Sequence, residues 1–240
     1  RKVPQEGQVR IDPDTTMSPK SWECVRHAVG GGLAATDAIF EGTSDNAFLA
    51  ARPPGHHAEK VTAMGFCLIN TAAVMARHAQ KQHGAERVAI VDWDVHHGNG
   101  TQDIFYEDPT VLYASTHQMP LFPGTGSKHE TGAGNIHNAP LSPGMGGEDF
   151  KQAFRERILP ALENFRPDLI IISAGFDAHH RDPLSNINLQ ADDFDWATGK
   201  LLEVAAQHSD NRVVSLLEGG YDLKGLAESC ASHVKRLMSG

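Results

Sequence analysis

The sequence is poor in cysteine. Its 240 residues include Cys24, Cys67 and Cys230, which lie far apart and form no CxxC pair. Three separated cysteines favour neither a disulfide framework nor a thiolate zinc site. We therefore expect the chain in a reducing compartment, of which the cytoplasm is the simplest choice.

Long apolar runs and basic charge are also lacking. No run approaches the ~20 apolar residues that a membrane span requires, and the chain, which begins at Arg1, shows no signal peptide, repeat or low-complexity segment. The 21 basic and 30 acidic residues give a formal net charge of −9. This charge disfavours nucleic-acid phosphates and favours cationic ligands. We expect neither a membrane partner nor direct nucleic-acid binding.

Apolar runs of strand length alternate with segments of helical periodicity, which predicts an α/β fold. We expect a three-layer αβα sandwich with a central, mostly parallel sheet, in one catalytic domain over residues 1–240. The expected strands are residues 47–51, 87–91, 110–114, 169–173 and 213–217, and the expected helices are residues 21–40, 70–82, 148–165, 191–208 and 223–238.

Two of the expected helices have further features. The first two have good capping residues at their starts, Ser18-Pro19 and Ser21 in one case and Asn70 in the other. Gly30-Gly31-Gly32 in the first helix costs roughly 1 kcal/mol per glycine relative to alanine. We therefore expect either close packing or a break there.

Chemically active side chains follow each of the expected strands. In a parallel sheet the carboxyl ends of the strands share one edge, so the loops there converge on a ligand. We therefore expect the catalytic loops at this edge. The groups that follow the five strands in turn are His56-His57, Asp92 to His97, His117, Asp177 to His180 and Glu218 to Tyr221.

The segment after the second strand has the composition of a metal site. In extended backbone alternate side chains share a face, so Asp92, Asp94 and His96 point away from Trp93 and Val95. The carboxylate of Asp94 and the imidazole of His96 can then reach the same divalent ion. The alternative is that these side chains only cap a following helix at residues 98–105.

Asp177, at the tip of the apolar run before it, would complete a set of two aspartates and one histidine. Three protein ligands leave a position for water and substrate, as in catalytic zinc sites. The oxygen-rich set also admits iron(II). The alternative role for Asp177 is to cap a loop.

Three more side chains could assist a metal. His56 and His57 follow a rigid Pro-Pro-Gly turn and can move protons near neutral pH. Asp92 and Asn99 are spare acceptors that could orient the two rings. Tyr221 follows two glycines and could donate a hydrogen bond to an oxyanion, although packing alone is the commoner role for such a residue.

Several separate motifs, in order, resemble the zinc-dependent histone deacetylase family of class II and bacterial type, within the arginase and deacetylase superfamily. The motifs are Arg52-Pro-Pro-Gly-His-His-Ala58, Gly65-Phe-Cys67, Asp92-Trp-Asp-Val-His-His-Gly-Asn-Gly100, Phe122-Pro-Gly-Thr-Gly126, Ala174-Gly-Phe-Asp177, Asp182-Pro183 and Glu218-Gly-Gly-Tyr221.

The resemblance implies a role for each matching residue. Asp94, His96 and Asp177 would hold Zn²⁺, His56 and His57 would be the tandem histidines, supported by Asp92 and Asn99, and Tyr221 would stabilise the oxyanion. A structural K⁺ or Na⁺ would be held by backbone carbonyls of Asp92, Asp94, His96 and Thr116 and by the Ser115 hydroxyl. Gly65, Phe66, Phe122 and Leu184 would line the substrate channel, and Asp14 would be a rim acid.

The implied activity is removal of acetyl or short acyl groups from lysine side chains of a peptide or protein, or from similar N-acyl alkylamines. One alternative is hydrolysis of acetylated polyamines or other small amides. A non-enzymatic alternative is an acyl-lysine binding module. A ureohydrolase of the same superfamily would need a two-metal cluster with more carboxylates.

The sequence departs from the family pattern at two places. Class I relatives have aspartate where Asn99 stands, and an amide holds an imidazolium less strongly than a carboxylate. His57 is therefore expected to be less basic than an aspartate-supported ring. The chain is also expected to lack the family's N-terminal strand and loop, in which case a homo-oligomer could cover the exposed edge.

Overall fold

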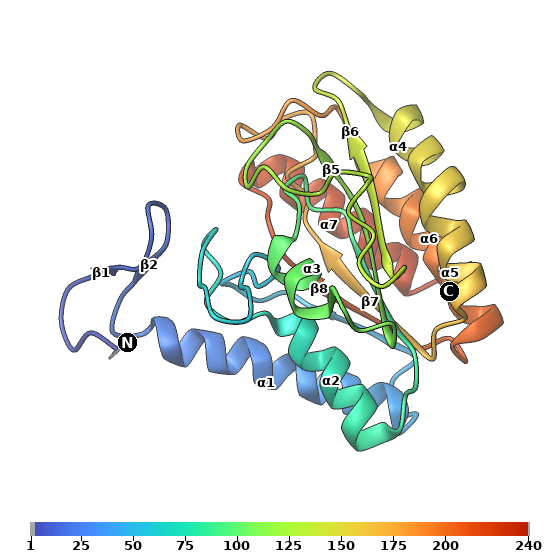
Figure 1. Cartoon of the computed structure of the whole chain (residues 1–240), viewed down its shortest axis with the longest axis horizontal. Helices are drawn as coiled ribbons and strands as arrows, with labels where there is room; N and C mark the ends of the chain where they lie inside the picture. Colours follow the sequence, from blue (N-terminus) through green and yellow to red (C-terminus); the bar gives the residue numbers. More distant parts are fainter. Residues whose placement is uncertain (1–2, 240) are drawn as a thin grey trace.

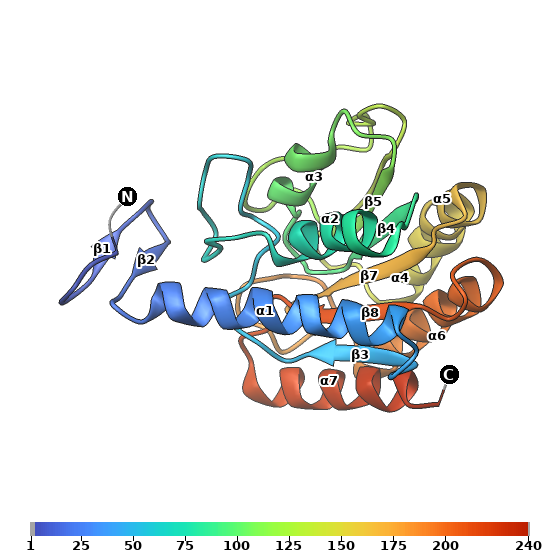
Figure 2. The same cartoon turned by 90° about the horizontal axis from the view of Figure 1, so that it is seen from below.

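The computed structural model describes residues 3–239, and within them a six-stranded parallel sheet lies between two layers of helices (Figures 1 and 2). The strand order is β3-β8-β7-β4-β5-β6. The predicted α/β sandwich is confirmed. The strands are β3 (Asn46–Leu49), β4 (Val88–Asp92), β5 (Val111–Gln118), β6 (Ile136–Leu141), β7 (Leu169–Ala174) and β8 (Val213–Leu217).

The two faces of the sheet bury separate apolar clusters. One face packs against α1 (Ser21–Phe40), α2 (Thr71–His83) and α3 (Asn99–Phe105). The other packs against α4 (Gly147–Ala153), the π-helical segment η1 (Phe154–Ile158), α5 (Leu159–Phe165), α6 (Ala191–His208) and α7 (Leu223–Leu237). Because both faces are covered, the central strands β4 and β7 are buried throughout.

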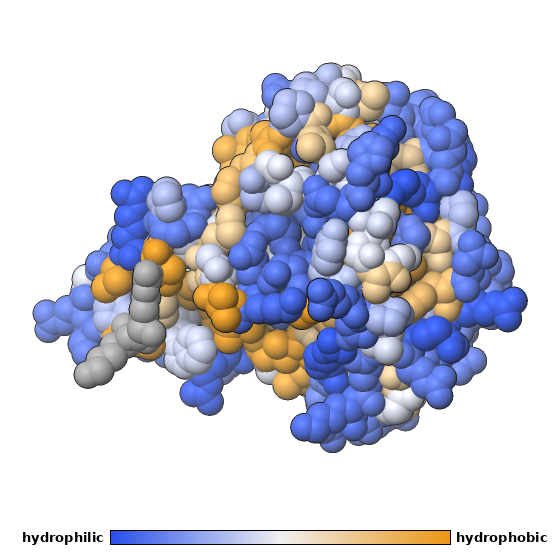
Figure 3. All heavy atoms as spheres, viewed as in Figure 1, coloured by the Kyte–Doolittle hydropathy of each residue, from blue (hydrophilic) through white to orange (hydrophobic). Residues whose placement is uncertain are grey.

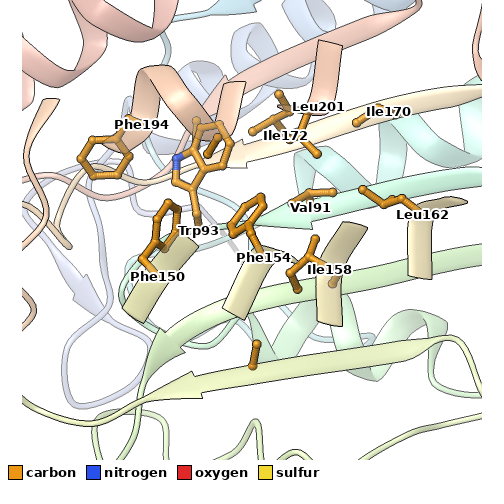
Figure 4. Packing of buried hydrophobic residues seen from close by; sticks show 14 of the residues in the cluster. Val91, Trp93, Phe150, Phe154, Ile158, Leu162, Ile170, Ile172, Phe194 and Leu201 are labelled. Carbon is orange, nitrogen blue, oxygen red and sulfur yellow. The ribbon is translucent and has the colours of Figure 1, made fainter. Parts of the chain in front are cut away.

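Trp93, directly after β4, is an anchor of the second cluster. It is 1% exposed and lies beside Phe150, Phe154 and Phe194 from the covering helices (Figure 4). Val91 and Val95 belong to the same cluster, so the alternation of side chains continues past the end of the strand. The intervening Asp92 and Asp94 are thereby directed to the opposite side.

Of the capping residues predicted for the first two helices, the one for α2 is confirmed and those for α1 are wrong. Asn70 caps α2, because its Oδ1 accepts a hydrogen bond of 2.9 Å from the Ala73 N–H. The predicted cap of α1 is wrong: this helix follows Lys20, and no side-chain capping bond is formed among the described residues. The Ser21 hydroxyl instead accepts the N–H of Ser18, at 2.9 Å.

The glycine triplet in α1 is a close-packing site rather than a break. A Cβ atom on Gly31 would lie 2.8 Å from Leu49 Cδ1, and one on Gly32 would lie 2.7 Å from Met75 Sδ. α1 continues through both residues without interruption. The cost in helix propensity therefore allows α1 to approach β3 and α2 closely.

Some elements were not expected. The helix predicted over residues 148–165 contains the π-helical segment η1, and Pro160 follows it at the start of α5. Proline lacks an N–H and its ring crowds the carbonyl four residues earlier, so a wider turn relieves the conflict. The additional strands are β6 and the antiparallel hairpin of β1 (Val9–Arg10) and β2 (Thr16–Met17).

The face of the molecule seen in Figure 1 is largely hydrophilic, with apolar side chains gathered beside the N-terminal hairpin (Figure 3). Exposed apolar side chains of the chain include Val61 and Trp22, which line a cavity next to that hairpin. Among the described residues, none of the helices combines the length and apolar character needed to cross a bilayer.

Candidate active site

The candidate site lies at the carboxyl edge of the sheet. β8, β7 and β4 are neighbours there, so the loops that follow them bring Tyr221, Asp177 and the Asp94 to His96 segment together. The loop after β3 adds His56 and His57. Parallel strands place their carboxyl ends on one side, which explains how residues so distant in sequence meet.

Three predicted metal ligands converge behind this edge. His96 Nδ1 lies 3.2 Å from Asp94 Oδ1 and 3.1 Å from Asp177 Oδ2. The three donor atoms fall within 4.8 Å of one another. The aspartates are buried, and His96 is the member that faces the pocket.

Backbone groups fix the orientation of both carboxylates. Asp94 Oδ2 accepts the Gly219 N–H at 2.7 Å, and Asp177 Oδ1 accepts the Val95 N–H at 2.9 Å. A Cβ on Gly219 would lie 2.3 Å from Asp177 Oδ2, and one on Gly175 would lie 2.3 Å from Asp94 Oδ2. Glycine at both positions therefore leaves the space that the carboxylates occupy.

The electrostatics of this group fit a cation. Burial, followed by the charge of Asp94, raises the pKa of Asp177 to about 7. Burial opposes protonation of His96, but its contacts with Asp177 and Asp94 outweigh this and raise the pKa of His96 to about 10. Two buried carboxylates thus demand positive charge between them, and the donor set of two oxygens and one nitrogen suits Zn²⁺ or iron(II).

The tandem histidines have the partners that the sequence suggested. His56 Nδ1 lies 3.0 Å from Asp92 Oδ2, and His57 Nδ1 lies 2.8 Å from Asn99 Oδ1. Asn99 Nδ2 donates to Glu59 Oε1 at 2.7 Å, which turns the amide oxygen toward His57. Neutral His57 therefore donates through Nδ1 and leaves Nε2 as an acceptor.

Their surroundings separate the basicities of the two rings. Burial opposes the charging of His56, but Asp94, Asp92 and Glu218 together raise its pKa well above the ordinary value. Burial, followed by the positive charge of His56, lowers the pKa of His57 well below the ordinary value. The pair thus has one ring suited to carry a charge and one suited to remain neutral.

Glu218 is a buried organiser of the site whose role the sequence did not reveal. Its Oε2 accepts the backbone N–H groups of Gly55 at 2.7 Å and His56 at 3.2 Å, and its Oε1 accepts the Ser173 hydroxyl at 3.0 Å. One side chain therefore joins the loop after β3 and strand β7 to the segment after β8. The sequence feature that could have indicated this role is the position of Glu218, an acidic residue directly after the apolar strand β8.

Tyr221 is held by its backbone and by its ring. Its N–H donates to Asp182 Oδ2 at 2.7 Å, and Arg52 donates to the Gly220 carbonyl at 2.6 Å while its guanidinium lies 5.6 Å from the tyrosine ring centroid. Burial, followed by the charges of Asp94 and Asp177, raises the pKa of Tyr221 above its ordinary value. The phenol therefore stays protonated and able to donate.

All four predicted channel residues meet at one cavity of about 220 Å³. The ring of Phe122 packs edge-on against His57 at 5.2 Å, and that of Phe66 against Tyr221 at 6.2 Å. Gly65 and Leu184 are the other two predicted channel residues, and the cavity is also lined by Asp14, Pro54, His56, His96 and Gly219.

The residues predicted for a monovalent cation lie in the second half of β5, at the last residue of β4 and in the segment after β4. Ser115 is buried and its hydroxyl lies 2.9 Å from His117 Nδ1. Thr116 Oγ1 is buried without a hydrogen-bond partner among the described residues. The K⁺ or Na⁺ site with Asp92, Asp94 and His96 stays a prediction.

The family described as "Histone deacetylase domain" matches residues 1–237. The chain belongs to this family. The predicted family is thereby confirmed.

Named relatives are similar over most of this chain. A histone deacetylase-like amidohydrolase of Pseudomonas aeruginosa is 45% identical over 90% of this chain and 58% of its own length. A probable deacetylase of Archaeoglobus fulgidus is 43% identical over 90% of this chain and 61% of its own length. The crystal structure of the HDA15 HD domain superposes with a TM-score of 0.92 at 40% identity, over 97% of this chain and 66% of that one.

The chain thus spans about 60% of the length of those two sequence relatives. The expectation of a single domain without the family's N-terminal strand and loop stays a prediction.

Proposed function

We propose that this chain is a zinc-dependent deacetylase that removes acetyl or short acyl groups from lysine side chains or similar N-acyl alkylamines. The observation that carries the proposal is the meeting of Asp94, His96 and Asp177 with His57 and Tyr221 at the base of one aromatic-walled cavity. A cation there would supply polarisation of the amide carbonyl and activation of water.

His57 is suited to be the general base. Its low pKa keeps it neutral at pH 7, and its bond to Asn99 leaves Nε2 to accept a proton from water. The same nitrogen can then return that proton to the leaving amine. Its neighbour His56, held charged by Asp92 and Asp94, would offset the negative charge that develops in the transition state.

Tyr221 is suited to donate to the oxygen of the former carbonyl as it gains charge. Its raised pKa keeps the proton on the phenol, and its contacts with Asp182 and Arg52 hold the backbone behind the ring. Phe66 and Phe122 would flank the alkyl chain of the substrate, since both rings border the cavity. A slender acyl-lysine side chain fits such walls.

The test is fluorophore release from acetyl-lysine and trifluoroacetyl-lysine peptides, with and without a zinc chelator. We expect chelator-sensitive turnover, a loss of about 10²–10³-fold in kcat for Tyr221→Phe and a loss of about 10²–10⁴-fold for His57→Ala. Tyr106→Phe and His129→Ala, at exposed positions, are matched controls.

Two other results would redirect the proposal. Turnover of acetylated polyamines in preference to the peptides would favour the small-amide alternative. Absence of turnover in protein that holds zinc, together with binding of the acetyl-lysine peptide, would contradict hydrolysis and favour a binding module.

A further inference from the structure

A second group of metal-ligand side chains lies at the opposite edge of the sheet. Asp37 is near the end of α1, and His78 and His83 are on α2, which ends at His83 just before β4 begins. Their donor atoms lie within 4.8 Å of one another. The cluster is thus on the amino side of the strands, away from the carboxyl edge where Tyr221 and His57 line the cavity described above.

Both imidazoles point at one carboxylate oxygen. His78 Nε2 lies 2.5 Å and His83 Nε2 lies 2.7 Å from the same atom, Asp37 Oδ1. The ring of His83 is stacked on Phe40 at 4.7 Å and 10°, which fixes its plane. Two rings from one helix and a carboxylate from its neighbour therefore converge on one point in space.

The donor set and the exposure suit a metal with an open position. Two imidazole nitrogens and one carboxylate oxygen form a ligand set that Zn²⁺, Ni²⁺ and Cu²⁺ accept. The side chains of His78, His83 and Asp37 are 20%, 17% and 41% exposed, so an ion and its water can reach them from solvent.

The two nitrogen–oxygen distances at Asp37 must widen to admit an ion. Tetrahedral ligands about 2.0 Å from Zn²⁺ lie roughly 3.3 Å from one another. The two nitrogen–oxygen distances at Asp37 would therefore widen by about 0.6–0.8 Å, which a partly exposed carboxylate can provide by rotating about its side-chain bonds.

We propose that Asp37, His78 and His83 form a second divalent transition-metal site, which joins α1 to α2. The site has no part in the deacetylase chemistry proposed above, and it stands or falls independently of it. The alternative is a group of hydrogen bonds in which the carboxylate only accepts from the two rings.

A histidine–carboxylate pair elsewhere supplies the matched control. His208 Nε2 lies 2.7 Å from Glu163 Oε2, a distance like that of His83 from Asp37, but the pair contains one imidazole. His208→Gln therefore removes an equally placed ring from a pair that has too few ligands for a stable site.

The test counts zinc on the full chain by equilibrium dialysis against Zn²⁺ alone. We expect each of His78→Gln, His83→Gln and Asp37→Asn to bind about one ion fewer per chain than the wild type, and His208→Gln to bind the same number as the wild type. This difference in the number of bound zinc ions is the same whether or not the group of Asp94, His96 and Asp177 also holds an ion. Equal zinc content in wild type and all three variants would overturn the proposal.

A stability measurement checks that the ion joins the helices. Zn²⁺ at about 100 times its Kd should raise the Tm of the wild type by a few degrees more than the Tm of His83→Gln. Circular dichroism before zinc is added shows whether each variant is folded. An equal zinc-induced rise in folded wild type and folded His83→Gln would contradict the bridge.

Discussion

The two histidine–aspartate clusters at opposite edges of the sheet differ in how far their geometry is fixed before a metal arrives. In the buried cluster the His96 nitrogen stands 3.1 and 3.2 Å from its carboxylate oxygens, close to the ~3.3 Å separation of tetrahedral zinc ligands. In the outer cluster the corresponding distances at Asp37 are 2.5 and 2.7 Å. One group is already spaced for an ion, while the other must open to receive it.

The difference follows from what surrounds the carboxylates. The backbone N–H groups of Gly219 and Val95 each hold the carboxylate oxygen that does not face His96, Oδ2 of Asp94 and Oδ1 of Asp177. Asp37 is held mainly by the two histidines. Preorganisation therefore comes from the strand ends, and we expect the buried cluster to bind metal more tightly than the outer one.

The largest expected effect comes from breaking the buried cluster. Asp177→Asn should lower kcat/KM on acetyl-lysine peptides by more than about 100-fold, because it removes a ligand. It should not unfold the chain, since the raised pKa of Asp177 means that its buried charge is unfavourable. Activity, bound zinc and Tm are the measurements.

Asp195→Asn, which alters a surface carboxylate paired with Arg236, is the control. Full activity in Asp177→Asn with zinc still bound would show that the buried cluster is not the catalytic one.

The next largest effect concerns the space that Gly219 leaves for the carboxylates of Asp177 and Asp94. Gly219→Ala should weaken zinc binding at the buried cluster by about 10–100-fold, because the new methyl group would displace Asp177 and Asp94. Gly30→Ala is the matched change, since nothing lies within 4 Å of a Cβ there. It should instead stabilise α1 by about 0.5–1 kcal/mol. Equal zinc affinity in Gly219→Ala and the wild type would refute the role of the glycine.

The third prediction, with a smaller expected effect, concerns the charge beside His57 in the candidate active site. Asn99→Asp, made together with Glu59→Gln so that two carboxylates do not face each other, places a negative charge beside His57. The pKa of His57 should rise by about one unit or more. Because the base must be neutral, the acidic limb of the pH–rate profile should move to higher pH, with Glu59→Gln alone as the control. An unmoved limb would contradict the assignment of His57 as the base.

The smallest effect is expected at the outer cluster without metal. Hydrogen bonds from His83 and His78 lower the pKa of Asp37, so its contribution to stability is present above its unfolded pKa and is lost as pH falls through the folded one. Asp37→Asn should therefore lower the Tm slightly at pH 7, by about a degree or two for so exposed a pair. The difference should shrink as the pH falls below the unfolded pKa of an aspartate and vanish once Asp37 is protonated in the folded state as well. A Tm difference between Asp37→Asn and the wild type that increased as the pH fell would contradict the predicted direction of the pH dependence.

Much of the fold was predictable because its central strands are continuous apolar runs. β8 has the expected bounds, β7 ends one residue later than expected, and β4 is shifted by one residue. β3 begins one residue and ends two residues earlier than expected, while β5 begins one residue later and continues four residues further. β6 was missed because it carries His137, Asn138 and Pro140, which an edge strand tolerates but which hide it in the sequence. Hairpin strands of two residues give no periodicity to detect.

The candidate site was predictable to a different extent. Alternation after β4 and the position of Asp177 after β7 were enough to suggest a shared ion. Asp92 and Asn99 were also suggested as acceptors for the two histidine rings, but the assignment of each acceptor to one ring depended on the resemblance to a family. The outer cluster could not be found from spacing, because His83 is five positions after His78 and that interval does not place two side chains on one face of a helix. Only the packing of α1 against α2 brings Asp37 between them.

The contacts of the N-terminal hairpin affect the order in which parts of the molecule unfold. Phe66 has a positive φ of 65°, a strained conformation for an aromatic residue, and its N–H is held by the Thr15 hydroxyl at 3.0 Å. The neighbouring Gly65 N–H is held by Asp14 at 3.1 Å. Warming or proteolytic nicking near residues 14–15 would thus let one wall of the cavity relax while β4 and β7 stay paired. Loss of substrate affinity would then precede loss of the fold, as a separate, lower-energy opening.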